Sequence, residues 1–157
     1  MMKKTKAIGS AKARKQVRQI TRRVLAHVKN RTPAEAAITL GLDVDDVRNM
    51  KQGNKFSVPM LFKMVVKGRF DPTSILEGPE LKKLHRARKT HRLKQVCLDA
   101  RIHALAWDYP GKELAKMTGL SVTGAYGLRY SDSHVTLYTV LGFIHSGASV
   151  EKLVFGK

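Results

Sequence analysis

The side chains with the plainest chemistry in this chain are lysines and arginines, and they gather in two stretches. Residues 1–31 hold 11 of them and no aspartate or glutamate, and residues 80–108 hold eight against three acidic side chains. Residues 32–79 hold six of each, and residues 109–157 hold five against three. Cations at this density favour the phosphates of a polyanion as a partner, because their mutual repulsion otherwise opposes folding.

The whole chain of 157 residues carries 30 basic against 12 acidic side chains, for a formal charge of +18 and a pI near 10.4. It is also 43% hydrophobic, which indicates a globular protein rather than a disordered polycation. The sequence has no apolar run of about 18 residues, and no apolar segment follows the basic start. We therefore expect a nucleic acid rather than a membrane as the partner, and a cytoplasmic, nucleoid-associated protein.

Ten cations are candidates for phosphate contacts. A charge run is often only a solvated face, but no carboxylate precedes Glu35, and this one-sided excess favours a phosphate partner. Residues 1–9 would form a flexible basic arm that follows the backbone or enters a minor groove. The ten candidates are Lys3, Lys4, Lys6, Lys51, Lys55, Lys82, Lys83, Arg86, Arg88 and Lys89.

The motifs of catalysis and metal binding are missing. Cys97, the only cysteine, lies in an apolar stretch, where a small buried residue is expected. Gly111-Lys112 lacks the rest of a phosphate-binding loop, and the six histidines form no pair with metal-ligand spacing. We expect Trp107 and Tyr109, at a helix end, to be core residues rather than a base-stacking platform. The sequence thus predicts no enzyme, no cofactor and no metal site.

The alternation of charge accompanies an internal repeat. At an offset of 78 residues the chain aligns with itself, without a gap, from about residue 10 to the end. We interpret the chain as two copies of one all-helical unit, with the boundary near Gly78-Pro79. The identical pairs are Arg14 with Arg92, Arg23 with Arg101, Ala26 with Ala104, Glu35 with Glu113, Ala37 with Ala115, Gly41 with Gly119, Leu42 with Leu120, Val44 with Val122 and Gly78 with Gly156.

Each copy contains a matching series of predicted helices. In copy one, a helix over about 10–29 has apolar residues on one face and basic residues on the other. In copy two the corresponding helix is predicted over 79–107, because Gly suits the end of one helix and Pro the start of the next. A second, short helix follows in each copy and ends at Gly41 or Gly119.

The segment around Gly41 has the residue types of a helix-turn-helix. Ala37 is small where two helices would cross, and Gly41 can take the positive φ of a tight turn. Leu42, Val47 and Met50 would then face inward and hold the second helix across the first. Copy two repeats the pattern with Ala115, Gly119, Leu120, Ala125 and Leu128. A plain helical repeat is the alternative, and two motifs at one offset favour the helix-turn-helix.

On these residues the chain resembles the lambda repressor/Cro-like family of helix-turn-helix domains. The resemblance rests on Gly41-Leu42, Val47, Met50 and Gly53 in copy one, and on Leu114-Ala115, Gly119-Leu120-Ser121 and Leu128 in copy two. It implies two tandem five-helix units, at 10–78 and 79–157, after the arm at 1–9. Copy two departs from the pattern at Ser131, which stands where copy one has Gly53.

The resemblance implies that the second helix of each motif enters the major groove of double-stranded DNA. Arg48 would pair with guanine and Asn49 with adenine through bidentate hydrogen bonds, and Asp45 would accept one from a cytosine amino group. The implied base-reading set is Asp45, Arg48, Asn49 and Gln52 in copy one and Thr123, Tyr126, Arg129 and Tyr130 in copy two.

Several polar residues beside these helices have a structural alternative. Asp43 and Ser121 each stand just before the second helix, where capping is a better interpretation than base contact. Asp46 lies three residues after Asp43, as in a capping box. The aspartates at 43, 45 and 46 would repel phosphate, so two possibilities stay open. Either both copies read DNA in different sequences, or copy two reads DNA while copy one binds a protein.

These inferences predict a sequence-specific regulator of transcription that occupies a promoter or operator, from a phage or another mobile element, where members of the family often serve. One alternative is an architectural or partition protein that coats DNA through backbone contacts. Another is a regulator whose first unit binds a protein such as RNA polymerase. The expected partner is double-stranded DNA, without a membrane. Either the two units of one chain occupy one long site, or a homodimer occupies a longer one.

Overall fold

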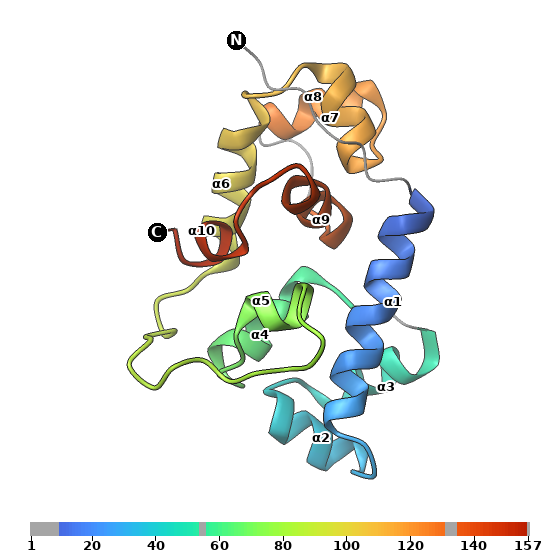
Figure 1. The fold of residues 1–157 in the computed structure, drawn as a ribbon, viewed down its shortest axis with the longest axis vertical. Coiled ribbons are helices and arrows are strands. Elements are labelled where there is room, and N and C mark those ends of the chain that lie inside the picture. Colours follow the sequence, from blue (N-terminus) through green and yellow to red (C-terminus); the bar gives the residue numbers. More distant parts are fainter. Residues whose placement is uncertain (1–9, 54–55, 131–134, 157) are drawn as a thin grey trace. The chain divides into compact units, whose positions relative to one another are not determined.

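Every regular element in the described part of the chain is an α-helix. The computed structural model describes residues 10–53, 56–130 and 135–156, and these residues form ten helices and no strand (Figure 1). Within them, a single isolated bridge pairs Phe70 with Lys83. The prediction of an all-α protein is confirmed.

The first of two compact units, Gln16–Lys94, is called the N-terminal unit and contains most of α1 and all of the next four helices. Thr32 and Glu35 start α2 with a reciprocal capping box. Side chains of Ser57 and Asp71 accept hydrogen bonds from backbone N–H groups at the starts of α4 and α5. The helices are α1 Ser10–His27, α2 Pro33–Leu40, α3 Val44–Gly53, α4 Val58–Val66 and α5 Pro72–Leu76.

The second unit, called the C-terminal unit, combines Gln95–Lys157 with Met1–Lys15. Its helices are α6 Gln95–Ala106, α7 Gly111–Thr118, α8 Val122–Arg129, α9 Leu137–His145 and α10 Val150–Phe155. The helices α7, α8 and α10 begin 78 residues after α2, α3 and α5. The helix starts thus recur at the offset that relates the two halves of the sequence.

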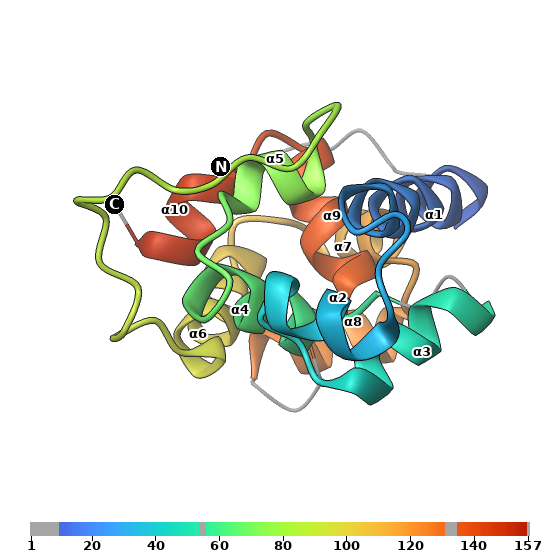
Figure 2. The same ribbon diagram turned by 90° about the horizontal axis from the view of Figure 1, so that it is seen from below.

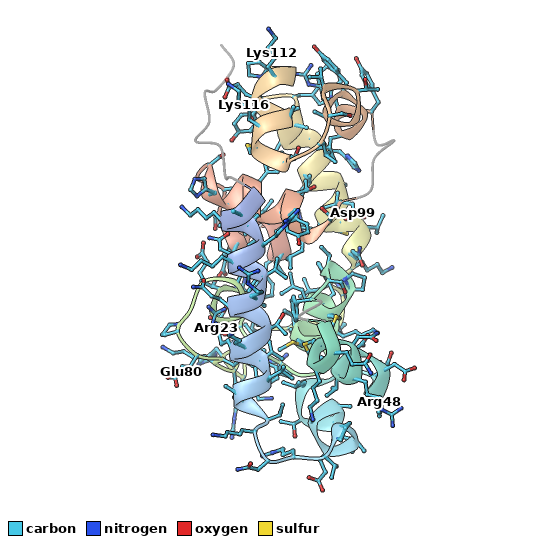
Figure 3. The ribbon with its side chains drawn as sticks, turned by 90° about the vertical axis from the view of Figure 1, so that its right-hand side faces the viewer. Arg23, Arg48, Glu80, Asp99, Lys112 and Lys116 are labelled. Atoms are coloured by element: carbon cyan, nitrogen blue, oxygen red, sulfur yellow. The ribbon has the colours of Figure 1, made fainter. Side chains whose placement is uncertain are left out.

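An arginine makes the same tertiary hydrogen bond in each unit. Arg23 of α1, labelled in Figure 3, donates to the carbonyl of Ile75 in α5. Arg101 of α6 donates to the carbonyl of Leu153 in α10 at 2.8 Å. Both acceptors lie in the last turn of a helix, where carbonyls have no intrahelical partner. Each arginine therefore ties the first long helix of its unit to the last short one.

Each unit has its own apolar core. The N-terminal core is built on Ile20, Val24, Leu40, Val47, Met50, Leu61, Phe70 and Ile75, all without exposed surface. The C-terminal core is built on Leu98, Ile102, Ala106, Leu114, Met117, Ala125, Leu128 and Phe143, which are equally inaccessible. Cys97, expected to be buried, is half-buried. Burial of these side chains supplies most of the driving force for folding each unit.

The helix predicted over 79–107 is much shorter in the structure, where α6 begins at Gln95. Residues 79–94, which we call the basic loop, form no helix and carry seven Lys and Arg side chains with a single Glu. Close like charges oppose a helix in such a segment. The N-terminal unit also supplies hydrogen-bond partners for the backbone of the basic loop. The Asp71 N–H donates to the Lys82 carbonyl at 2.8 Å, and the Leu84 N–H donates to the Arg69 carbonyl at 2.7 Å.

Arg69 and Thr90 fasten the remainder of the basic loop. The Arg69 guanidinium donates to the His85 carbonyl at 3.1 Å and to the Thr90 hydroxyl at 3.3 Å. The Thr90 hydroxyl donates in turn to the carbonyl of Val66 at 3.2 Å. Leu81 and Thr90 are buried. The basic loop is therefore packed against the N-terminal unit while it carries a high density of positive charge.

Alanine at the two turn glycines provides a matched pair of stability tests. Both Gly41 and Gly119 have a left-handed conformation, with φ of 76° and 74°. A Cβ at residue 41 would also collide with the Gly68 backbone, whereas one at residue 119 would meet nothing within 4 Å. We expect Gly119→Ala to cost about 1 kcal/mol and Gly41→Ala to cost distinctly more, as measured by urea unfolding. Equal losses would contradict the close approach of residues 41 and 68.

Candidate nucleic-acid interface

In the N-terminal unit, α2 and α3 pack against each other across a turn at Gly41 (Figure 2). The left-handed Gly41 and the following Leu42 both donate backbone N–H groups to the carbonyl of Ala37, the latter at 3.0 Å. Val47 and Met50 of α3 are fully buried. Leu42, Val47 and Met50 thus hold α3 on the core, as the spacing predicts, and the opposite face of α3 is turned to solvent.

That solvent face carries the residues expected from copy one. Asp45, Arg48, Asn49 and Gln52 are all exposed, and Lys51 lies beside them in the same exposed state. Figure 3 shows Arg48 projecting from α3 away from the body of the unit. The ion pair between Arg48 and Asp45, at 3.8 Å, is long and solvated and holds neither side chain firmly.

Two of the three aspartates at the start of α3 are paired with a lysine of α4. Lys63 Nζ lies 2.9 Å from carboxylate oxygens of both Asp43 and Asp46. The hydrogen bond from Lys63 and its charge lower the pKa of Asp43, and these carboxylates raise the pKa of Lys63. Asp46 also accepts the Asp43 backbone N–H at 3.2 Å, which is half of the expected capping box. Repulsion of phosphate here is consequently weaker than three aspartates imply.

In the C-terminal unit, α7 and α8 pack across the equivalent turn at Gly119. The Gly119 N–H donates to the carbonyl of Ala115, and the Ser121 side chain caps α8 by accepting from Gly124 N–H at 3.1 Å. Capping by Ser121 is therefore confirmed. The inward residues Ala125 and Leu128 are fully buried, and Thr123, Tyr126 and Tyr130 are exposed.

Arg129, the fourth residue expected to read bases in copy two, is engaged within its own unit. Its guanidinium donates to the carbonyl of Ala106 at 3.4 Å and to that of Tyr109. It also lies 5.2 Å from the ring centre of Tyr126 and 5.4 Å from that of Trp107. These contacts hold the charge at the C-terminal end of α6, where a cation is favoured by the helix carbonyls.

The two aromatic residues at the end of α6 have different environments. Tyr109 is buried, as expected, and meets Phe143 edge-on with ring centres 5.7 Å apart. Trp107 is 49% exposed, so its prediction as a core residue is wrong. The 78-residue repeat indicates this exposure, because the equivalent of Trp107 in the first copy is Lys29, a charged residue that is also exposed. The indole N–H donates to the Arg129 carbonyl at 3.1 Å, which satisfies its only polar group outside the core.

The candidate phosphate-binding residues fall into three groups. Lys51, Lys82, Arg86 and Lys89 are exposed, and Arg88 is half-buried. Lys83 is also exposed, but its Nζ donates to the Gly68 carbonyl at 2.6 Å and lies 4.0 Å above the Phe70 ring. Burial lowers the pKa of Lys83. Lys3, Lys4, Lys6 and Lys55 lie outside the described residues, as does Ser131.

Two exposed lysines of α7 are further candidates for phosphate contacts that the helix-turn-helix motif does not predict. Lys112 and Lys116 lie one turn apart on the outer face of α7, and Figure 3 shows both at the surface. Their counterparts at the 78-residue offset are Ala34 and Ile38, so the repeat contains no hint of them. They add exposed positive charge to the helix that precedes α8.

Both units carry a net positive charge. The N-terminal unit has eighteen Lys and Arg residues against seven Asp and Glu, and the C-terminal unit has twelve against five, of which residues 1–15 supply six cations and no anion. Comparisons of the chain with protein-family models, curated proteins and solved structures give no match. Among the described residues, no cluster of His, Cys, Asp or Glu could hold a metal ion, and no helix is long and apolar enough to cross a membrane.

Replacing Lys63 with methionine tests the pairing at the start of α3. We expect the variant to unfold more easily than wild type at neutral pH, because two carboxylates lose their cation. Since the folded pKa of Asp43 is lowered, this contribution is present above the unfolded pKa and disappears as the pH falls through the folded value. Urea unfolding at a series of pH values should show the two proteins converging in acid. The exposed Lys29→Met variant, as control, should show no such pH-dependent difference.

Proposed function

We propose that the protein is a DNA-binding regulator that reads duplex DNA through two helix-turn-helix units. The observation that carries the proposal is the pair of helix turns at Gly41 and Gly119, each followed by a helix with one buried and one solvent-facing side, on a chain of charge +18. A helix presented in this way fits the major groove, and the charge matches a polyanion. The tandem lambda-repressor-like arrangement is part of the proposal.

The N-terminal unit would supply both phosphate contacts and base contacts. Its basic loop presents Lys82, Arg86 and Lys89 to solvent, and α3 presents Arg48 and Asn49. Because Lys63 engages Asp43 and Asp46, the acidic start of α3 repels phosphate less than the sequence suggests. These observations support DNA contact by this unit over a purely protein-binding role.

The C-terminal unit would read DNA mainly with uncharged side chains. Thr123, Tyr126 and Tyr130 are exposed along α8, and the guanidinium of Arg129 is held by carbonyls of its own unit. We therefore leave Arg129 out of the proposed direct base contacts. Promoter or operator occupancy in a phage or mobile element, with double-stranded DNA as partner in the nucleoid, completes the proposed role.

A second candidate function, DNA coating through backbone contacts, is favoured by the basic loop. Its exposed cations stand on irregular backbone rather than on a groove-sized helix, and such contacts position a protein without reading sequence. The two functions differ in specificity. A regulator binds one site at least a thousandfold more tightly than other duplexes, whereas a coating protein shows a steep salt dependence without that ratio.

Selection of bound sequences from a random duplex pool at physiological salt tests the leading proposal. We expect enrichment of one motif, whose length reports how many recognition helices are engaged and whose symmetry reports any dimer. A pool that stays random after selection, with every duplex bound equally, would overturn sequence-specific regulation and leave the coating function.

Substitutions within α3 separate base contact from phosphate contact. The double variant Arg48→Ala/Asn49→Ala should lose about 10- to 100-fold in affinity for the selected site and discriminate less between sequences. Lys51→Ala, on the same helix, should instead weaken binding to the selected site and to every other duplex by the same factor. Fluorescence polarisation with labelled duplexes measures both. Unchanged DNA affinity in the double variant would assign α3 to a protein partner.

Substitutions in the basic loop test its contribution. Removing two exposed cations with Lys82→Ala/Arg86→Ala should lower affinity for every duplex and reduce the slope of log K against log salt by about 2. Lys152→Ala, an exposed cation on α10, serves as the control. A salt slope that is the same in the loop variant and in wild type would show that DNA does not contact the basic loop.

A further inference from the structure

Three aromatic side chains are exposed together at the C-terminal end of α8. Trp107 is 49% exposed, Tyr126 45% and Tyr130 62%. The rings of Trp107 and Tyr130 meet edge to face with centres 5.2 Å apart, and the Arg129 guanidinium lies within about 5.4 Å of the rings of Trp107 and Tyr126. We call this group the aromatic cluster. Large apolar rings left in water in this manner indicate a contact surface.

The aromatic cluster is held in place by its own unit. The indole N–H of Trp107 is bound to the Arg129 carbonyl, and the Arg129 side chain is anchored on carbonyls at the end of α6. The ring of Tyr126 lies over Gly111, where an added Cβ would come within 2.7 Å of the ring. A surface fixed before binding loses little conformational freedom when a partner arrives.

The electrostatic setting indicates what the aromatic cluster contacts. Residues 95–157, which contain the aromatic cluster, carry six cations against five anions, so this segment lacks the dense positive charge of the basic loop. It offers rings and one fixed guanidinium, which are the groups on which nucleobases stack. Bases inside a regular duplex are already stacked on both faces. Rings can stack on a base only where the stack is open, as at a kink, a bulge or a single strand.

We propose that the aromatic cluster binds unpaired or unstacked bases of DNA. This rests on the proposed function, since it takes the partner to be DNA, and it adds a preference for duplexes that are locally opened beside the site of α8. Tyr126 lies on α8, Tyr130 directly follows it, and Trp107 packs against Tyr130, so a recognition helix seated in a groove would bring these rings next to the adjoining base steps. Stacking on one base contributes about a tenfold gain in affinity.

Trp107 is the only tryptophan, so its fluorescence reports directly on the aromatic cluster. The full chain is titrated with four DNAs of matched length: a perfect duplex, a duplex with a short run of unpaired bases, the same duplex with abasic sites in that run, and a single strand. We expect strong quenching and about tenfold tighter binding with unpaired bases, relative to the abasic duplex. The abasic duplex has the same backbone and flexibility, so the difference isolates the bases.

Two tyrosine variants identify the residues responsible. Tyr130→Leu removes one ring of the cluster and keeps the tryptophan reporter, and it should abolish the preference for unpaired bases over abasic sites. Tyr138→Leu on α9 is the matched control, because Tyr138 is 42% exposed and lies outside the cluster. It should behave as wild type. Circular dichroism confirms that both variants are folded.

Trp107→Phe provides a second test, measured by binding of labelled DNA. Because phenylalanine keeps an aromatic ring at residue 107, this variant should preserve part of the preference for unpaired bases.

The possible outcomes separate this inference from the proposed function. Tight binding of the perfect duplex with equal responses to unpaired and abasic DNA would overturn the inference and leave duplex recognition standing. Quenching by single-stranded and bulged DNA without duplex binding would support the inference and overturn the duplex-reading role. Failure to bind any of the four DNAs would overturn both.

Discussion

The geometry of both units depends on a glycine held at positive φ between two helices. At Gly41 and at Gly119 the chain turns within the three residues that separate the two helices, and the next helix then packs against the preceding one with its apolar side on the core. In the N-terminal unit Gly41 also approaches the Gly68 backbone, so the ends of α2 and α4 meet with no side chain between them. This close contact positions the turn that leads into α3. Any displacement of α3 would expose the buried Val47 and Met50, so its opposite face is the one turned to solvent.

The two units use equivalent positions to build different surfaces. In the N-terminal unit Lys63 joins Asp43 and Asp46, and the three residues at the offset of 78 are Leu141, Ser121 and Gly124. The whole charged group is thus replaced by neutral residues in the C-terminal unit. Aromatic side chains in turn occupy positions 107 and 130, where the first copy has Lys29 and Gln52. One scaffold therefore presents a charged surface in one unit and an aromatic surface in the other.

The helix boundaries were largely predictable because the interactions that set them are local. Thr32 and Ser121 cap their helices through hydrogen bonds to residues three positions ahead, and the turn glycines bond to carbonyls four positions behind. Two predictions about the second copy, the helix over 79–94 and the burial of Trp107, were wrong for a common reason. Residues 79–94 and Trp107 have partners 8 to 24 residues away, such as Arg69 with His85 and Trp107 with Arg129. No local pattern reveals such partners.

The sequence alone determined the all-helical class, the starts of the short helices, the two glycine turns and the inward residues of α3, because each follows from periodicity or from bonds within one turn of helix. Tertiary structure decided which cations have partners within their unit: Lys83 lies over Phe70 and Lys63 binds two carboxylates. It also decided that Trp107 is exposed. The reason is that a charged or aromatic side chain is placed by acceptors and rings from other elements, whose positions exist only after the chain has folded.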